Sequence, residues 1–187
     1  AASTHDGEED LVLDAHRRVL RAVPDALLIL VPRHPQRFEG VRDLVKRRGF
    51  DVVSRTEDRP VPADCPVFLG DTMGEVPLFY AAADVAFVGG SLVPIGGHNL
   101  LEPAAAGVAI LAGPHNFNAQ EIADMLMDKN ACRVVDDSED LADAVVALFG
   151  DADERRRMTE HAAGIIATNR GALSRLLEMI QPLVETD

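Results

Sequence analysis

The sequence lacks the segments and motifs of several large classes of protein. No apolar run in its 187 residues approaches the roughly 18 residues that cross a membrane, and the N-terminus has no signal-peptide pattern. Cys65 and Cys132 stand far apart in the chain, which excludes the close spacing of a zinc or redox motif. We therefore expect two buried thiols and a reduced, cytosolic compartment.

Basic residues are also scarce relative to acidic ones. Lys and Arg together number 18 against 31 Asp and Glu, which gives a net charge of −13. A surface that binds nucleic acid or an anionic membrane needs a basic footprint, so we expect neither partner on this chain. An anionic small molecule is not excluded, because a helix N-terminus and one or two local cations can hold a phosphate on an acidic protein.

Short apolar runs alternate with helical stretches along most of the chain. The predicted strands are 26–31, 50–54, 66–69, 85–88, 108–111 and 132–135. The first predicted helix begins near residue 6. Further helices are predicted over 36–48, 75–83, 100–106, 119–127 and 139–149. Strands that alternate with helices across short turns predict an α/β fold, a Rossmann-like doubly wound parallel sheet, over residues 1–150.

The last residues, 151–187, are predicted to be helical. Met158, Ala162, Ile165 and Ile166 form one apolar stripe, and a second stripe runs from Leu173 to Val184. We expect these C-terminal helices to pack on the sheet domain, or on a domain outside these residues.

The start of the chain resembles the turn that follows a strand, although no strand precedes it. Asp6 with Glu9 predicts a helix start of the capping-box kind. Because the first strand of a doubly wound sheet commonly lies centrally, we expect that strand to be missing and the chain to be a piece of something longer.

The stretch from Gly89 to Pro103 is the strongest candidate for a ligand site. It follows a predicted strand, opens a predicted helix and contains four glycines within nine residues. Such a turn directs backbone N–H groups and the positive end of a helix toward an anion, and glycine lets the backbone approach closely.

Polar side chains follow several other predicted strands, and ligands of open α/β sheets bind outside these carboxyl ends. Arg33 offers a phosphate or carbonyl bidentate donors, or it is a solvated loop charge. Glu102 would accept hydrogen bonds from a ribose diol, or it only complements the helix dipole. His98 faces either an anion or a turn carbonyl.

Motifs of other chemistries are absent. The chain has no P-loop lysine motif, no G-x-G-x-x-G turn opening a helix, no G-x-S-x-G elbow and no Cys/His cluster with metal-ligand spacing. Nucleotide binding without these motifs favours the donor-binding half of a sugar-nucleotide transferase, and no metal is expected.

Six segments together resemble the motifs of the 3-deoxy-D-manno-octulosonic acid (Kdo) transferase family. They are STHDGEE at 3–9, PRHP at 32–35, GDTMGE at 70–75, GGSL at 89–92, GGHNLLEP at 96–103, and GPH with FN at 113–118. The resemblance implies the C-terminal, donor-binding domain of a two-domain (GT-B) glycosyltransferase. Such enzymes transfer Kdo from CMP-Kdo to a lipid A precursor with inversion, in lipopolysaccharide biosynthesis.

The resemblance also implies which residues contact CMP-Kdo. They are Pro32, Arg33, Met73, Gly74, Glu75, Asn99 and Glu102, with Ser91, Gly96, Gly97 and His98 as further candidates. We expect the base at the Pro32–Arg33 loop, the ribose at Glu102 and the phosphate at the glycine-rich turns. Helix dipoles and Arg33, with no cofactor and no metal, would stabilise the leaving group.

In that family the general base, the acceptor surface and any membrane anchor lie in the N-terminal domain. We therefore expect no catalytic residue in this chain, no transfer by it alone, and a location on the cytoplasmic side of the bacterial inner membrane through the absent domain. Two rivals remain: a GT-B enzyme that uses UDP- or GDP-sugar, and a non-enzymatic Rossmann-like module.

Overall fold

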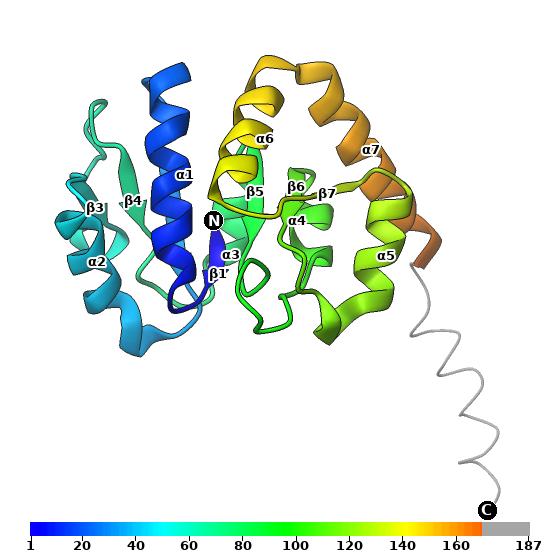
Figure 1. The fold of residues 1–187 in the computed structure, drawn as a ribbon, viewed down its shortest axis with the longest axis horizontal. Helices are drawn as coiled ribbons and strands as arrows, with labels where there is room; N and C mark the ends of the chain where they lie inside the picture. Colours follow the sequence, from blue (N-terminus) through cyan, green and yellow to red (C-terminus); the bar gives the residue numbers. More distant parts are fainter. Residues whose placement is uncertain (170–187) are drawn as a thin grey trace, which may run out of the picture.

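The computed structural model describes residues 1–169, and these form a parallel β-sheet with helices on both faces (Figure 1). The seven strands of this part run in the order β3-β4-β2-β1-β5-β6-β7, and every neighbouring pair is parallel. Their bounds are β1 Ala2–Thr4, β2 Leu28–Pro32, β3 Val52–Ser54, β4 Val67–Leu69, β5 Val85–Val88, β6 Ala109–Ala112 and β7 Cys132–Val134. The predicted doubly wound α/β fold is confirmed.

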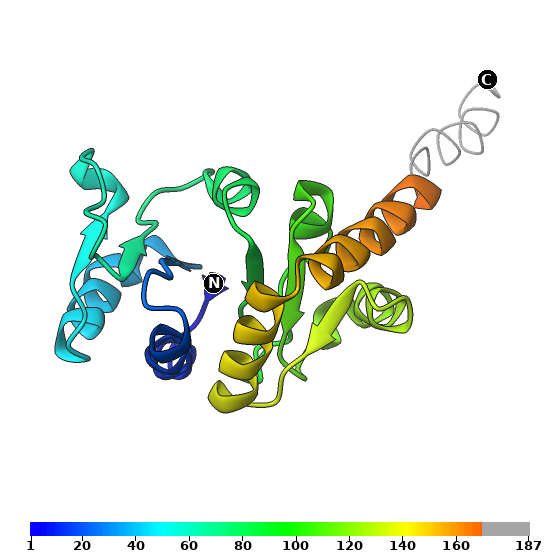
Figure 2. The same cartoon turned by 90° about the horizontal axis from the view of Figure 1, so that it is seen from above.

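Helices connect the strands and cover the two faces of the sheet. Their bounds are α1 Glu8–Ala22, α2 Phe38–Arg47, α3 Val76–Ala81, α4 Leu101–Ala106, α5 Gln120–Asp128, α6 Ser138–Gly150 and α7 Ala152–Asn169. Three short 3₁₀ helices are η1 Pro35–Arg37, η2 Arg55–Glu57 and η3 Phe117–Ala119. Figure 2 shows α1 and α6 side by side on one face, with α3 and α4 on the other.

The core divides according to these two faces. Leu13 and Val19 of α1 and Leu141 of α6 pack with Leu30 and Leu111 from the sheet. On the opposite face, Phe79 and Tyr80 of α3 are buried with residues of β1, β2 and β5. Burial of a large apolar side chain contributes about 1.5–3 kcal/mol, so these layers hold the strand ends in place. Both cysteines are buried and free, as the sequence predicts.

The central strand corrects one expectation from the sequence. We expected the first strand to be missing, but Ala2–Thr4 forms a short strand in the central position. Ala2 pairs with Val31 of β2 on one side and with Val88 of β5 on the other. Three residues are too few to show the apolar run or the alternation by which a strand is recognised, so the sequence did not reveal it.

The position of β1 locates the crevice of the fold. From β1 the chain passes to β2 on one side, and β5 later joins the opposite side. Ligands of doubly wound sheets bind at such a switch point, outside the carboxyl ends of the strands. The turns after β1, β2 and β5 meet there.

The start of α1 also differs from the prediction. No Asp6–Glu9 capping box forms; Gly7 occupies the N-cap position with φ 79° and no side-chain cap. The carboxylates of Glu8 and Glu9 are buried instead of capping the helix. A left-handed φ suits glycine at this sharp turn from β1 into α1.

Helix α7 extends past the sheet after α6 and lies against α4, α5 and β6 (Figure 1). Met158, Ala162 and Ile165 of the predicted stripe are buried, and Ile166 is partly buried. The predicted stripe from Leu173 to Val184 lies outside the described residues. The division of the chain at residue 150 stays a prediction. In the described part, no helix is long and apolar enough to cross a membrane.

Candidate functional site

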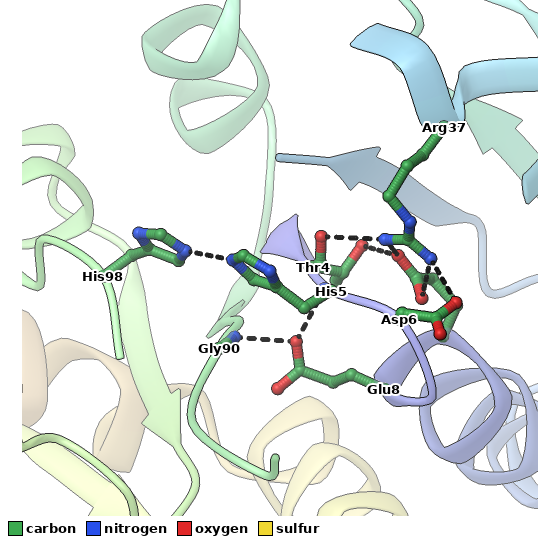
Figure 3. Close-up of polar contacts among 8 residues, drawn as sticks. Thr4, His5, Asp6, Glu8, Arg37, Gly90 and His98 are labelled. Atoms are coloured by element: carbon green, nitrogen blue, oxygen red, sulfur yellow. Dashed lines mark hydrogen bonds and ion pairs between the residues drawn. The ribbon is translucent and has the colours of Figure 1, made fainter. Parts of the chain in front are cut away.

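Three histidines meet where β1, β2 and β5 end. His5 follows β1, His34 follows β2, and His98 lies in the turn between β5 and α4. The rings of His5 and His98 are nearly parallel, with an interplanar angle of 8° and centroids 5.0 Å apart, and the His34 ring lies edge-on to the His5 ring at 5.4 Å. The Nε2 atoms of His5 and His98 are 2.7 Å apart, a hydrogen bond that Figure 3 shows. We call His5, His34 and His98 the histidine cluster.

Burial and neighbouring cations keep two of these histidines neutral. Burial lowers the pKa of His98 to about 4, and His5, Arg33 and His34 add to the effect. Burial also lowers the pKa of His5, as do His34, Arg37 and Arg33, while Glu9 opposes the shift. Burial and surrounding cations disfavour the charged form of an imidazole, so His5 and His98 bind few protons at neutral pH.

Arg33 stands at the rim of the histidine cluster. Its backbone N–H donates to the Thr4 carbonyl at 3.0 Å, which ties the loop after β2 to β1. Its side chain is exposed and forms no ion pair with a carboxylate of residues 1–169. Pro32, the other residue expected at this loop, is buried at the end of β2.

The glycine-rich turn after β5 already holds an anion, the carboxylate of Glu8. The N–H groups of Gly90, Ser91 and Leu92 donate to the Glu8 oxygens at 2.7, 3.1 and 3.0 Å. Figure 3 shows the first of these bonds. The N–H of His5 donates to the same carboxylate at 3.2 Å. We expected these amides to face a ligand's phosphate; the structure corrects this, since a buried carboxylate of α1 occupies them.

Ser91, Gly96 and Gly97 brace the turns against one another. Ser91 is fully buried, and its hydroxyl donates to the Val88 carbonyl and accepts from the Gly113 N–H. The N–H groups of Gly96 and Gly97 both donate to the Gly90 carbonyl. Both glycines have positive φ, which strains any other residue. A Cβ on Gly96 would lie 2.5 Å from the side chains of Phe117 and Asn118 in η3, and a Cβ on Gly97 would lie 2.6 Å from Asn116 Oδ1. Their approach to a ligand stays a prediction.

Glu9 joins a second buried network beside the histidine cluster. Its carboxylate accepts from the Thr4 hydroxyl at 2.9 Å and from the Arg37 guanidinium at 2.6 and 2.9 Å. Arg37 also pairs with the exposed Asp6 at 3.2 Å (Figure 3). The hydrogen bond from Arg37 to the Glu9 carboxylate raises the pKa of the guanidinium, so Arg37 stays positively charged.

The turn between β4 and α3 carries three of the expected donor contacts. Met73 is 61% exposed, and Gly74 has φ 83° with open space around it. Glu75 accepts hydrogen bonds from the Thr72 hydroxyl and from Arg55, and these bonds lower its pKa. An ionised carboxylate is thus held beside an exposed methionine at this edge.

Asn99 and Glu102 form a local pair at the start of α4. The Asn99 amide donates to Glu102 at 3.2 Å, and its oxygen accepts from the Leu101 N–H at 3.0 Å. Glu102 is exposed. Burial raises the pKa of Tyr80 in α3, and the nearby charge of Glu102 raises it further. This links α3 with α4 and so places Glu75 and Glu102 on neighbouring elements.

Sequence reasoning found some of these residues and missed others. Of the expected residues, His98 belongs to the histidine cluster and Arg33 lies at the rim of this cluster. Glu75 and Glu102 lie on the adjacent α3–α4 side of the edge. His5, Glu8, Glu9, His34 and Arg37 were not among the expected contacts. Glu8 and Glu9 stand one helical turn before buried Val12 and Leu13, and that spacing was a usable signal of inward-facing acids.

Metal ligation finds no support in the described residues. No group of three or more His, Cys, Asp or Glu side chains in residues 1–169 is arranged to hold a metal ion. In the histidine cluster, the Nε2 atoms of His5 and His98 are hydrogen-bonded to each other and do not point at a common position. The expectation that the site works without a metal stays an expectation.

The sequence profile of the "Glycosyl transferases group 1" family matches residues 10–164. The chain belongs to that family. The match begins within α1 and covers β2 to β7, including the turns after β2, β4 and β5, while β1 and the first residues of α1 precede it.

Curated relatives narrow the similarity further. The chain is 44% identical over 186 residues to the 3-deoxy-D-manno-octulosonic acid transferase of Haemophilus influenzae, covering 99% of this chain and 44% of the relative. It is 37% identical over 187 residues to the enzyme of the same name from Bordetella pertussis, covering 96% and 43%. The chain therefore spans less than half the length of these relatives.

A solved structure of similar length shows the same fold. It is the C-terminal CMP-Kdo binding domain of WaaA from Acinetobacter baumannii, which is 36% identical with a TM-score of 0.85. The match covers 88% of this chain and 86% of that domain. Similarity thus extends over nearly the whole of one donor-binding domain.

Proposed function

We propose that this chain is the donor-binding half of an inverting glycosyltransferase that transfers Kdo from CMP-Kdo to a lipid A precursor in lipopolysaccharide biosynthesis. The observation that carries the proposal is the likeness to a CMP-Kdo binding domain over 86% of that domain at 36% identity. The identity of 44% to a Kdo transferase supports the same substrate.

The nucleotide base is proposed to lie at the Pro32–Arg33 loop. The loop is anchored to β1 by the Arg33 N–H, while the guanidinium extends into solvent without a partner among the described residues. A planar guanidinium offers paired donors to a carbonyl or a phosphate, and Met73 and Gly74 supply an exposed apolar surface and open backbone nearby in the crevice.

The ribose is proposed to bind Glu102. Asn99 holds one carboxylate oxygen of Glu102, which orients the side chain and leaves lone pairs for a diol. Glu75, held ionised by Thr72 and Arg55, is a second acceptor on the adjoining turn. Gly96, Gly97 and Ser91 would then serve by keeping the β5–α4 turn in shape.

The acceptor and the base that activates it are proposed to belong to an N-terminal domain outside these residues. The chain would bind the donor and position its leaving group, with Arg33 and the helix ends stabilising the departing CMP without a metal. By itself it would not transfer Kdo. The complete enzyme would work at the cytoplasmic face of the bacterial inner membrane, and no nucleic acid would take part.

Calorimetric titration of the chain with CMP, UMP and GMP tests this proposal. We expect selective binding of CMP, weakened about tenfold in Glu102→Gln because one charged hydrogen bond to the ribose is lost. Glu121→Gln is the matched control, since Glu121 is also an exposed glutamate in the first turn of a helix, and its binding should be unchanged.

Other outcomes would favour the rivals. Preferential binding of UMP or GMP would indicate a GT-B donor domain with a different sugar nucleotide. A folded sample that binds none of the three would contradict the donor-binding proposal and leave a Rossmann-like module whose turns serve packing alone.

A further inference from the structure

The amides of the glycine-rich turn are occupied by Glu8, so an oxyanion of the donor needs another partner at this edge. The carboxylates nearest the crevice are already engaged. Glu8 accepts four backbone N–H groups, and Glu9 and Asp6 pair with Arg37. Beside these carboxylates, Arg33 forms no ion pair within residues 1–169, and the side chains of His5 and His98 are hydrogen-bonded only to each other.

We propose that the histidine cluster, together with Arg33, is an oxyanion-binding subsite that takes up one proton when the phosphate or the carboxylate of the donor binds. This rests on the proposed function, since it assumes a donor that carries these groups. Both are oxyanions and demand the same donors, N–H groups with positive charge behind them.

The geometry of the His5–His98 pair leaves a ring nitrogen available to accept that proton. A 2.7 Å contact between two Nε2 atoms requires that one ring donates and the other accepts. In the neutral pair, the donating ring therefore lacks a hydrogen on Nδ1. Neither Nδ1 atom has a hydrogen-bond partner within residues 1–169, so a proton from solvent can add there without breaking the bond between the rings.

The charges around the pair explain why the proton arrives only with an oxyanion. They come from every neighbouring element: Arg33 and His34 after β2, Arg37 in η1, Glu9 and Glu8 in α1. In the empty site the cations and burial favour neutral rings. An oxyanion between Arg33 and the rings offsets that repulsion, raises the pKa of the pair and so makes binding consume a proton.

The sign of the pH dependence follows. Because bound protein holds the extra proton, affinity is greatest at low pH and decreases as the pH rises. We expect the Kd for CMP to increase about three- to tenfold per pH unit between pH 6 and 8. An ordinary phosphate site would behave oppositely, since CMP becomes dianionic above a phosphate pKa of about 6.

Calorimetry of the chain with CMP in two buffers of different ionisation enthalpy counts the protons directly. At pH 7 we expect an uptake of about 0.5–1 proton per CMP and none with cytidine, which would assign the phosphate. If CMP shows no uptake but free Kdo added to the CMP complex does, the subsite holds the carboxylate. If CMP binds and neither arm takes up a proton, the inference is wrong although the proposed function stands.

Variants separate the subsite from simple structural support. The double variant His5→Gln, His98→Gln keeps amide groups in place of the imidazoles but cannot take up a proton. It should bind CMP in a manner that no longer weakens as the pH rises. His161→Gln changes an exposed histidine of α7 and should match the unaltered chain.

Thermal unfolding shows whether the double variant is folded. If it is not, His34→Gln takes its place in the test. His34 is exposed, so this change should leave stability intact while it reduces proton uptake and weakens CMP binding about threefold. Unaltered uptake in His34→Gln and in any folded double variant would overturn the proposal. A chain that binds no CMP at any pH would instead refute the proposed function, and the subsite with it.

Discussion

A single carboxylate organises the edge of the sheet at the residue scale. Glu8 is fully buried and gathers N–H groups from two turns that are separated by more than eighty residues in sequence. Burial raises the pKa of Glu8, and the amide donors work against that shift. An acid in the first turn of α1 thereby fixes the backbone after β5.

The first prediction concerns this carboxylate. Glu8→Gln keeps the size of the side chain but replaces one accepting oxygen by an NH₂ group that faces backbone donors. We expect a loss of about 2–4 kcal/mol in the free energy of unfolding, measured by urea denaturation at pH 7.

Glu39→Gln is the control for Glu8→Gln. Glu39 is an exposed glutamate in the first turn of α2, and its replacement should change stability by less than about 0.5 kcal/mol. Equal stability of the Glu8 variant and the unaltered chain would show that the turn does not depend on the carboxylate.

Elements were predicted well where one segment carries its own pattern. The apolar run of β5, Val85–Val88, has the predicted bounds, and α5 differs from its prediction by one residue at each end. A strand buried in a parallel sheet needs an uninterrupted apolar run, so it can be recognised from its own residues alone. The three residues of β1 carry no such pattern, and their place in the sheet depends on partners elsewhere.

The candidate site was less predictable than the fold for a similar reason. That polar side chains gather at strand ends follows from topology, and it correctly placed Arg33 and His98 at one edge. That Glu8 occupies the amides of Gly90 depends on how α1 packs against the turn after β5. No spacing within either segment encodes this contact, so glycine-rich turns looked vacant in the sequence.

The second prediction concerns the close approach of two loops. A Cβ on Gly113 would lie 2.2 Å from the Ser91 carbonyl oxygen, which is backbone and cannot move aside. Gly113→Ala should therefore destabilise the fold by more than about 2 kcal/mol in urea denaturation.

Gly164→Ala provides the contrast to Gly113→Ala. Gly164 lies within α7 with nothing near its missing Cβ, and alanine there should stabilise by about 0.5–1 kcal/mol. If both substitutions had the same sign, the proposed clash beside Ser91 would be refuted.

At the scale of the whole molecule, α7 closes the domain. It leaves α6 and returns across α4 and β6, so the far end of the described chain packs beside the helix that carries Glu102. Ala162 has no exposed surface in this contact. The C-terminal helix therefore supports the sheet edge to which the donor is proposed to bind.

The third prediction tests this support. Ala162→Glu would force a charge into the seam between α7 and the α4–β6 layer, and we expect a loss of at least about 3 kcal/mol in unfolding free energy. The same change at the neighbouring Ala163, which is exposed, should have little effect. Limited proteolysis should release α7 early in the first variant alone, and identical digestion of both would contradict the packing.

The carboxylate under the glycine-rich turn has a further consequence for how fast and how tightly a ligand can be captured. Since Glu8 satisfies the turn in the empty protein, this part of the backbone does not need to become ordered at the moment of encounter. A site that is already ordered loses little conformational entropy when a ligand binds. The free energy of the contacts with Arg33 and Glu102 would therefore act almost fully to slow the dissociation of the donor.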